Sequence, residues 1–264
     1  MKVLRAAVAL IVGIYLLLLG LLWSMQERLI FPGWSGPSAS AVASVPGLED
    51  IRIPHGDGST RSGWWRQPDD GAPTLVIFHG NAGTQWGRLP AFAARGFGIL
   101  LIPYGGYAGN PGAPSEPGLM ADGMVALAAL RAKGVKPEDT ILYGESLGTG
   151  VAAQMALEPG DWRGVVLDAP YLSVAQRAAE VHWYFPVDHL IRHRFDTASI
   201  IQDIQAPILI LHGTDDRVIP IHHGEAVFAL AGGRARAIWV PGGSHYLPTE
   251  LVVNAVAETF AETD

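Results

Sequence analysis

A glycine-flanked serine is the feature of this sequence best suited to chemistry. It occurs in Gly144-Glu145-Ser146-Leu147-Gly148, which follows a short apolar run and opens a stretch rich in alanine and other small residues. A sharp turn from strand to helix exposes the central side chain, and glycines two positions before and after it leave room for the neighbouring chain. This context predicts that Ser146 is a nucleophile. The alternative for so short a motif is a structural serine.

A serine nucleophile needs a base that removes its proton and an acid that holds the base in one tautomer. On such a turn the partners follow in the order serine, acid, histidine. Asp215 and Asp216 follow the apolar run that ends at Leu211, and His245 follows the last apolar run in a loop with glycines. The other histidines precede the acids or lie at the start of the next helix. We predict His245 as the base and Asp215 or Asp216 as the acid, the other aspartate capping the turn.

Two backbone amides are the predicted donors for an oxyanion, the charge that develops when a carbonyl is attacked. The N–H of Leu147 lies at the N-terminus of the expected helix, where free donors and the helix dipole favour negative charge. The loop His79-Gly80-Asn81-Ala82-Gly83 has the small residues that a second donor needs. We predict the N–H of Asn81 for that role and interpret His79 as a packed histidine bonding the loop backbone.

The elements that must position these groups alternate along the chain. Short apolar runs typical of strands buried on both faces cover residues 74–78, 98–102, 140–143, 164–167, 207–211 and 237–240. Helix-like stretches cover residues 119–130, 147–157, 222–230 and 247–260. This alternation predicts an α/β fold, a mostly parallel sheet with helices on both faces and a site at the carboxyl ends of the strands. Residues 171–200 break the pattern, and we interpret them as a small helical insertion or lid; the alternative is an ordinary outer-layer helix.

The first segment of the chain is predicted to be a membrane anchor. From Ala6 to Met25 there is no charged residue, and twenty helical residues span about 30 Å, the thickness of the bilayer's hydrocarbon core. We expect an uncleaved anchor over residues 1–28, a linker over 29–50 and the folded domain over 51–264; a cleaved signal peptide is the alternative. The flanking Lys2 and Arg5 place the N-terminus in the cytoplasm and the domain on the other side, the periplasm if the cell is bacterial.

Composition excludes several classes of protein. The chain has 264 residues, is 49% hydrophobic and 16% charged, and has no cysteine, which excludes disorder, disulfide scaffolds, iron–sulfur clusters and thiol nucleophiles. The net charge of −7 disfavours nucleic acid as a partner. Residues 29–264 hold 24 acids and 15 bases, so the anchor, rather than the acidic domain, is expected to bind the membrane.

Together these motifs resemble an α/β-hydrolase. More narrowly, the chain is similar to the membrane-anchored BEM46-like group, which includes the eukaryotic ABHD13 and ABHD17 types of serine hydrolase. The matching segments are the anchor with residues 26–32, then 79–83, 104–118, the turn at Ser146, 212–216 and 244–245. The group's H-G-x-x-D pattern points to Asp216 over Asp215. One segment departs: the group commonly reads Asp-Tyr-Arg-Gly-Tyr-Gly where this chain has Pro103-Tyr104-Gly105-Gly106-Tyr107-Ala108.

The resemblance implies hydrolysis of carboxylic esters or thioesters, small-molecule or lipid-like, through an acyl-enzyme, in the carboxylesterase and thioesterase class EC 3.1. No metal or organic cofactor is expected. The alternatives are a peptidase or amidase on the same triad, and a non-catalytic binding protein that retains the fold. A dehalogenase or an epoxide hydrolase would require an aspartate at position 146.

Overall fold

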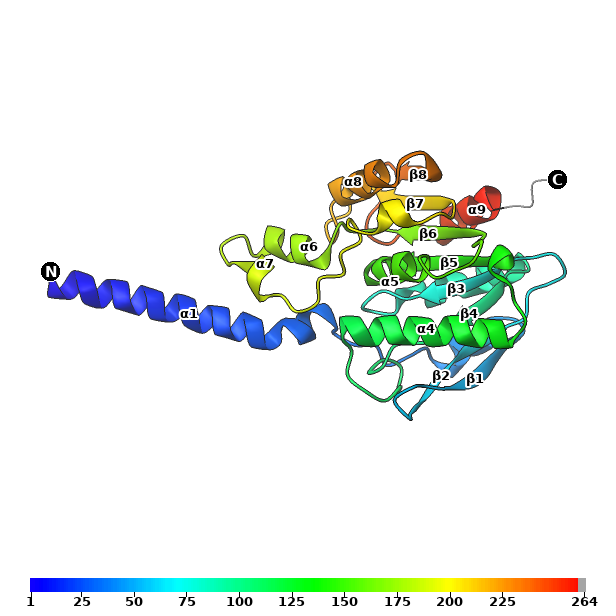
Figure 1. The fold of residues 1–264 in the computed structure, drawn as a ribbon, viewed down its shortest axis with the longest axis horizontal. Coiled ribbons are helices and arrows are strands. Elements are labelled where there is room, and N and C mark those ends of the chain that lie inside the picture. The colour runs from blue at the N-terminus through cyan, green and yellow to red at the C-terminus, as the bar shows by residue number, and fades with distance from the viewer. Residues whose placement is uncertain (261–264) are drawn as a thin grey trace.

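One mixed sheet forms the centre of the molecule in the computed structural model, which describes residues 1–260 (Figure 1). Its strand order is β1-β2-β4-β3-β5-β6-β7-β8. β1 and β2 pair antiparallel, as do β2 and β4. All the remaining neighbouring pairs, from β4 to β8 in the strand order, are parallel. The strands are β1 (Leu48–Pro54), β2 (Thr60–Arg66), β3 (Thr74–Phe78), β4 (Gly98–Leu101), β5 (Thr140–Glu145), β6 (Gly164–Asp168), β7 (Ile208–Gly213) and β8 (Ala235–Val240).

Helices cover both faces of the sheet because the side chains of each central strand alternate between two apolar layers. In β3, Val76 and Phe78 belong to one layer, and Leu75 and Ile77 belong to the other. α4 (Glu116–Ala132), α5 (Leu147–Met155) and α8 (Ile221–Ala231) pack in the first layer; α3 (Leu89–Ala94) and α9 (Thr249–Thr259) pack in the second. The predicted α/β architecture, a mostly parallel sheet with helices on both faces, is thus confirmed. Short 3₁₀ helices cover Thr84–Arg88, Pro137–Asp139, Ile201–Asp203 and Gly232–Arg234.

The N-terminal helix α1 (Lys2–Ile30) projects away from the sheet (Figure 1). It is long and apolar enough to cross a membrane. The segment predicted as a linker lies against the domain: it includes α2 (Ala39–Ala43), its Phe31 and Val45 are buried, and β1 begins at Leu48.

The insertion after β6 contains α6 (Val174–Val181) and α7 (Val187–Leu190). It leaves the sheet from the carboxyl end of a parallel strand and projects on the same side of the molecule as α1 (Figure 1). We refer to residues 174–190 as the lid.

Candidate active site

The turn at Ser146 joins β5 to α5 and has an unusual backbone conformation. Ser146 has φ of 51° and ψ of −120°, a region that costs a side-chain-bearing residue roughly 1–3 kcal/mol. A Cβ at Gly148 would lie 1.9 Å from the carbonyl oxygen of Phe78, and one at Gly144 would lie 2.5 Å from the Gly148 oxygen. Both glycines are therefore required by close backbone contacts, as the pentapeptide predicted.

Three of the predicted residues form a hydrogen-bonded chain. His245 Nε2 lies 3.1 Å from Ser146 Oγ, and His245 Nδ1 lies 2.7 Å from Asp216 Oδ2. The three side chains come from the carboxyl ends of β5, β7 and β8, which meet at one edge of the sheet. Asp215 is exposed, and its carboxylate accepts from the hydroxyl of Thr214. Of the two candidate acids, the structure brings Asp216 to the histidine.

Asp216 is held by its own turn. Its Oδ1 accepts from the N–H groups of Val218 at 2.8 Å and Ile219 at 2.9 Å, and its Oδ2 lies 3.4 Å from His212 Nε2. Burial raises the pKa of Asp216, but the hydrogen bonds from His212, His245 and the Ile219 amide outweigh it and hold the pKa well below its usual range. The acid is therefore an anion that accepts a hydrogen bond from His245.

The two backbone segments predicted to supply the oxyanion donors lie next to the serine. Leu147 is the first residue of α5, so its N–H has no partner one helical turn earlier. The loop after β3 passes beside the serine, because a Cβ at Gly80 would lie 3.3 Å from Ser146 Cβ, and Asn81 follows directly. His79 is buried and contacts the backbone at both ring nitrogens, the carbonyl of Gly80 and the N–H of Tyr104. Burial lowers its pKa to about 4.

Two proteins illustrate the sequence relatives of this chain. The uncharacterized protein Rv2307c of Mycobacterium tuberculosis is 33% identical over 252 aligned residues, covering 92% of this chain and 89% of that protein. Human α/β-hydrolase domain-containing protein 17B is 35% identical over 182 residues, covering 65% of this chain and 60% of its own length. The chain is therefore similar to α/β-hydrolase domain-containing proteins. The predicted resemblance to the ABHD17 type is confirmed.

Solved structures agree with this fold. The esterase Pf2001 of Pyrococcus furiosus matches with a TM-score of 0.66 at 17% identity, over 84% of this chain and 92% of the esterase. A puromycin hydrolase matches with a TM-score of 0.66 at 19% identity, over 85% of this chain and 40% of its own. No protein-family model matches the chain.

A buried charged cluster lies beneath the serine turn, and sequence reasoning missed it. Arg88 contacts the carboxylate of Asp168, lies 3.2 Å from the carboxylate of Glu145 and donates to the carbonyl of Leu247. Tyr143 donates to Asp168 at 2.7 Å. The Asp168 carbonyl accepts from the Ser146 N–H at 2.8 Å. The cluster thus connects the ends of β5 and β6 to the His245 loop.

Replacing Arg88 with methionine should destabilise the fold by about 3–5 kcal/mol, because Glu145 and Asp168 would lose the cation that they share in the interior. Their side chains are 2% and 0% exposed. Thermal unfolding of the detergent-solubilised full chain measures this loss. Arg95→Met is the matched control, since Arg95 is exposed, and its change should stay within about 0.5 kcal/mol. Equal stabilities of the two variants would contradict the role given to Arg88.

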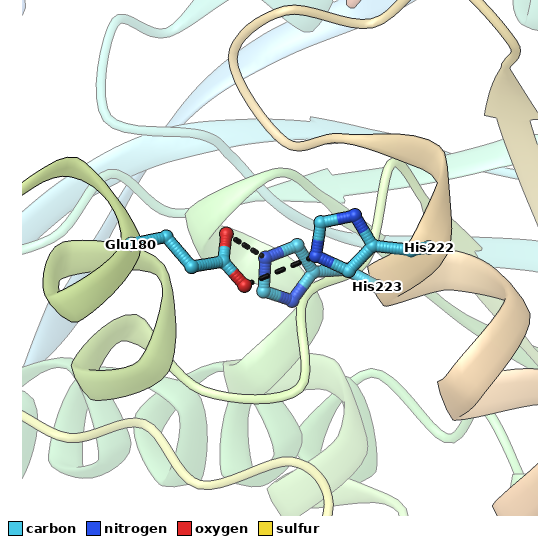
Figure 2. A group of neighbouring side chains, drawn as sticks. All are labelled: Glu180, His222 and His223. Atoms are coloured by element: carbon cyan, nitrogen blue, oxygen red, sulfur yellow. Dashed lines mark hydrogen bonds and ion pairs between the residues drawn. The ribbon is translucent and has the colours of Figure 1, made fainter. Parts of the chain in front are cut away.

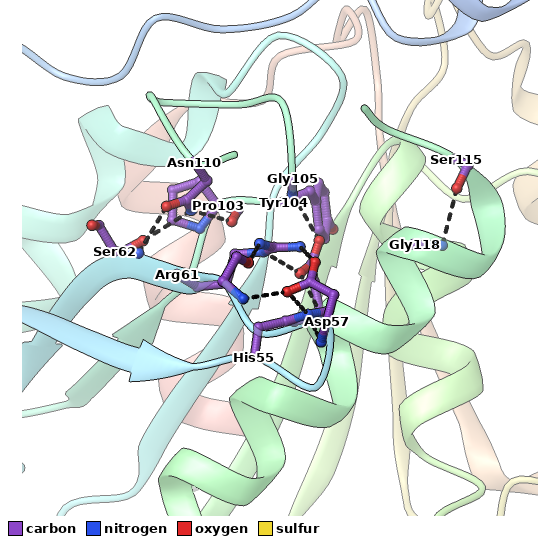
Figure 3. Close-up of polar contacts among 12 residues, drawn as sticks. His55, Asp57, Arg61, Ser62, Pro103, Tyr104, Gly105, Asn110, Ser115 and Gly118 are labelled. Atoms are coloured by element: carbon purple, nitrogen blue, oxygen red, sulfur yellow. Dashed lines mark hydrogen bonds and ion pairs between the residues drawn. The ribbon is translucent and has the colours of Figure 1, made fainter. Parts of the chain in front are cut away.

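The loop that departs from the family pattern is held by a second buried ion pair, between Arg61 and Asp122. Figure 3 shows Arg61 together with Gly105 and Asn110 of this loop. Asp122 of α4 accepts from Arg61 Nε at 2.6 Å and from the N–H of Gly105 at 2.7 Å. Asn110 donates to the carbonyl of Pro103 at 2.6 Å. A Cβ at Gly105 would lie 3.2 Å from Arg61 Nη2. A guanidinium from β2 therefore lies beside the position where the family commonly has an arginine.

The lid is attached to the body through Glu180, whose two carboxylate oxygens each lie 3.0 Å from a histidine Nε2 of α8, those of His222 and His223 (Figure 2). These residue types and spacings suit a metal ion. However, His223 Nδ1 accepts from the Leu172 N–H at 3.4 Å, which assigns the ring proton to Nε2, the atom that a metal would need. Burial lowers the pKa of His223 although Glu180 opposes this. We therefore interpret the group as a hydrogen-bonded clamp.

Proposed function

We propose that this hydrolase cleaves carboxylic esters or thioesters through an acyl-enzyme formed on Ser146. The chain of hydrogen bonds from Ser146 through His245 to Asp216 carries the proposal. Ser146 Oγ attacks the carbonyl carbon while His245 Nε2 takes the hydroxyl proton, and the Asp216 carboxylate stabilises the imidazolium that forms. The N–H groups of Asn81 and Leu147 donate to the oxyanion of the tetrahedral intermediate.

The second half of the reaction uses the same groups. The intermediate collapses, the bond to the leaving oxygen or sulfur breaks, and His245 returns its proton to the departing alcohol or thiol. A water molecule then attacks the acyl-enzyme, His245 takes the water proton, and a second collapse releases the carboxylic acid and restores the Ser146 hydroxyl. Every proton is carried by His245, so no cofactor is needed.

Two other functions use the same fold. An amidase or peptidase would use the same three groups, and the puromycin hydrolase among the structural neighbours favours keeping this candidate. A non-catalytic binding protein is the third candidate, but it has no need for the strained serine turn or for an aspartate held ionised in the interior.

Substrate assays separate these candidates. We expect hydrolysis of p-nitrophenyl esters and of an acyl thioester by the purified full chain, with an initial burst of p-nitrophenol that matches the enzyme concentration, and slower or no cleavage of a peptide anilide. The burst follows if the acyl-enzyme accumulates. Cleavage of the anilide alone would indicate the amidase. If every substrate stayed intact, the binding protein would be favoured.

We further propose that α1 anchors the hydrolase in a membrane with its N-terminus in the cytoplasm. The support is its length, its apolar composition and the bases Lys2 and Arg5 before the apolar stretch. The catalytic domain then lies on the outer side of the membrane, a position that protease digestion of intact spheroplasts tests.

A further inference from the structure

The lid lies along the apolar stretch of α1. If α1 crosses a membrane, part of the lid is therefore at the depth of the bilayer. Tyr15 Oη donates to the carbonyl of Tyr184 at 3.1 Å, and the rings of Tyr15 and Phe185 lie 5.2 Å apart. Tyr15 is ten residues before Met25, the last residue of the apolar stretch. At 1.5 Å per helical residue this is about 15 Å, half of a hydrocarbon core of about 30 Å.

The contacts between α1 and residues 190–192 lie at the end of the apolar stretch. Gln26 Nε2 donates to the carbonyl of Leu190 at 3.3 Å, and Gln26 Oε1 accepts from the N–H of Arg192 at 2.8 Å. Arg192 also pairs with Glu27 at 2.8 Å, and its guanidinium lies 4.1 Å from the ring centroid of Trp23. A tryptophan and charged groups at one level are typical of a membrane–water interface. The lid tip therefore extends from this level toward the centre of the apolar helix.

The composition of the lid tip, residues 181–187, suits that position. Val181, Trp183 and Tyr184 are 48%, 80% and 52% exposed, and His182 is the one residue of this stretch that can be charged near neutral pH. The charged residues on either side contact the rest of the protein: Glu180 contacts α8, and Asp188 lies beside Arg194. Aromatic side chains so exposed are costly in water, and apolar surroundings such as those of the α1 apolar stretch would remove that cost.

A groove between α1 and the lid continues this apolar surface. Its lining is apolar except for Gln26 and His182, and it includes Leu19, Leu22, Leu29, Phe185, Val187 and Ile191. Its walls belong to the same two elements that reach the level of Tyr15. The groove therefore runs from the interface level, at Gln26 and Leu29, into the apolar stretch, at Leu19 and Leu22.

We propose that the lid tip is a membrane-inserted element and that the groove beside it holds the acyl chain of a bilayer lipid. The proposal rests on the proposed anchorage by α1. The lid and α1 then form one apolar unit that a lipid-like molecule contacts from within the bilayer.

The absence of cysteine from the chain allows a direct test. The full chain, as Trp183→Cys, Leu17→Cys or Arg131→Cys, is labelled with a nitroxide and reconstituted into phosphatidylcholine vesicles. Collision rates with oxygen, which prefers hydrocarbon, and with a water-soluble nickel chelate are then compared. The label at 17 reports α1, and the label at 131 reports the exposed far end of α4.

We expect the labels at 183 and 17 to collide more with oxygen than with nickel, and the label at 131 to show the reverse. Nickel access at 183 like that at 131, with 17 still protected, would overturn lid insertion and leave the anchor intact. Nickel access at 17 would overturn the anchorage and the lid proposal together. The label at 183 could instead be protected from both reagents, with its spectrum broadened by a label on a neighbouring copy. This result would overturn the proposal and indicate that the lid contacts a second copy of the chain.

Discussion

Ser146→Ala should abolish ester hydrolysis, with kcat falling by a factor on the order of 10⁶, the loss typical of a triad without its nucleophile. Alanine keeps the Cβ, so the turn, with its φ of 51° and its contacts to Gly80, has the same shape in the variant. The hydroxyl that His245 contacts at 3.1 Å is what disappears. The same substitution should remove covalent labelling by a fluorophosphonate, which reacts with an activated serine and reports the nucleophile independently of any substrate choice.

Ser244→Ala is the matched control for this experiment. Ser244 is exposed and adjacent to His245, so a serine is lost next to the site while the three proposed catalytic groups remain. Labelling and hydrolysis should both stay at the level of the unmodified chain. Labelling that survived in Ser146→Ala would assign the nucleophile to another residue.

Sequence patterns predicted the elements that are buried on both sides. The six apolar runs correspond to β3 through β8. Five of these strands, β3 to β7, are buried along their whole length, since a strand covered by helices on both faces must be apolar throughout; β8, at the sheet edge, is only partly buried. β1 and β2 were not predicted, because they form the antiparallel edge of the sheet and mix exposed with buried positions, as in Leu48–Pro54. α3, only six residues long, provides too little periodicity to be recognised.

The catalytic candidates could be predicted because this type of serine turn is followed along the chain by an acid and then a histidine. Contacts between residues far apart in the sequence could not be predicted. The residues alone left Asp215 and Asp216 open; the structure separates them because a turn directs one inward and leaves the other exposed. Nothing in the sequence pairs Arg88 with Asp168, 80 residues away. A signal for Arg61–Asp122 did exist, because Asp122 lies on the apolar side of α4 next to Gly123, and a buried carboxylate requires a partner.

Asp216→Asn should lower kcat by about 10⁴, and the contacts of the carboxylate explain why. The asparagine Oδ1 can keep the hydrogen bonds from the N–H groups of Val218 and Ile219, which leaves Nδ2, a donor, facing His245 Nδ1. The ring must then carry its proton on Nε2, the atom 3.1 Å from Ser146 Oγ. A protonated Nε2 cannot accept the serine proton, so the base is lost while the turn is kept.

Asp215→Asn is the control, and its kcat should stay near that of the unmodified chain because its carboxylate is exposed. Equal losses in the two variants would contradict the assignment. Stability gives a second readout: the folded-state pKa of Asp216 is depressed, so its ionised form stabilises the fold above the ordinary carboxyl pKa of about 4. As pH falls below that value the contribution is lost. Thermal unfolding should therefore show the stability advantage of the unmodified chain over Asp216→Asn narrowing in acid.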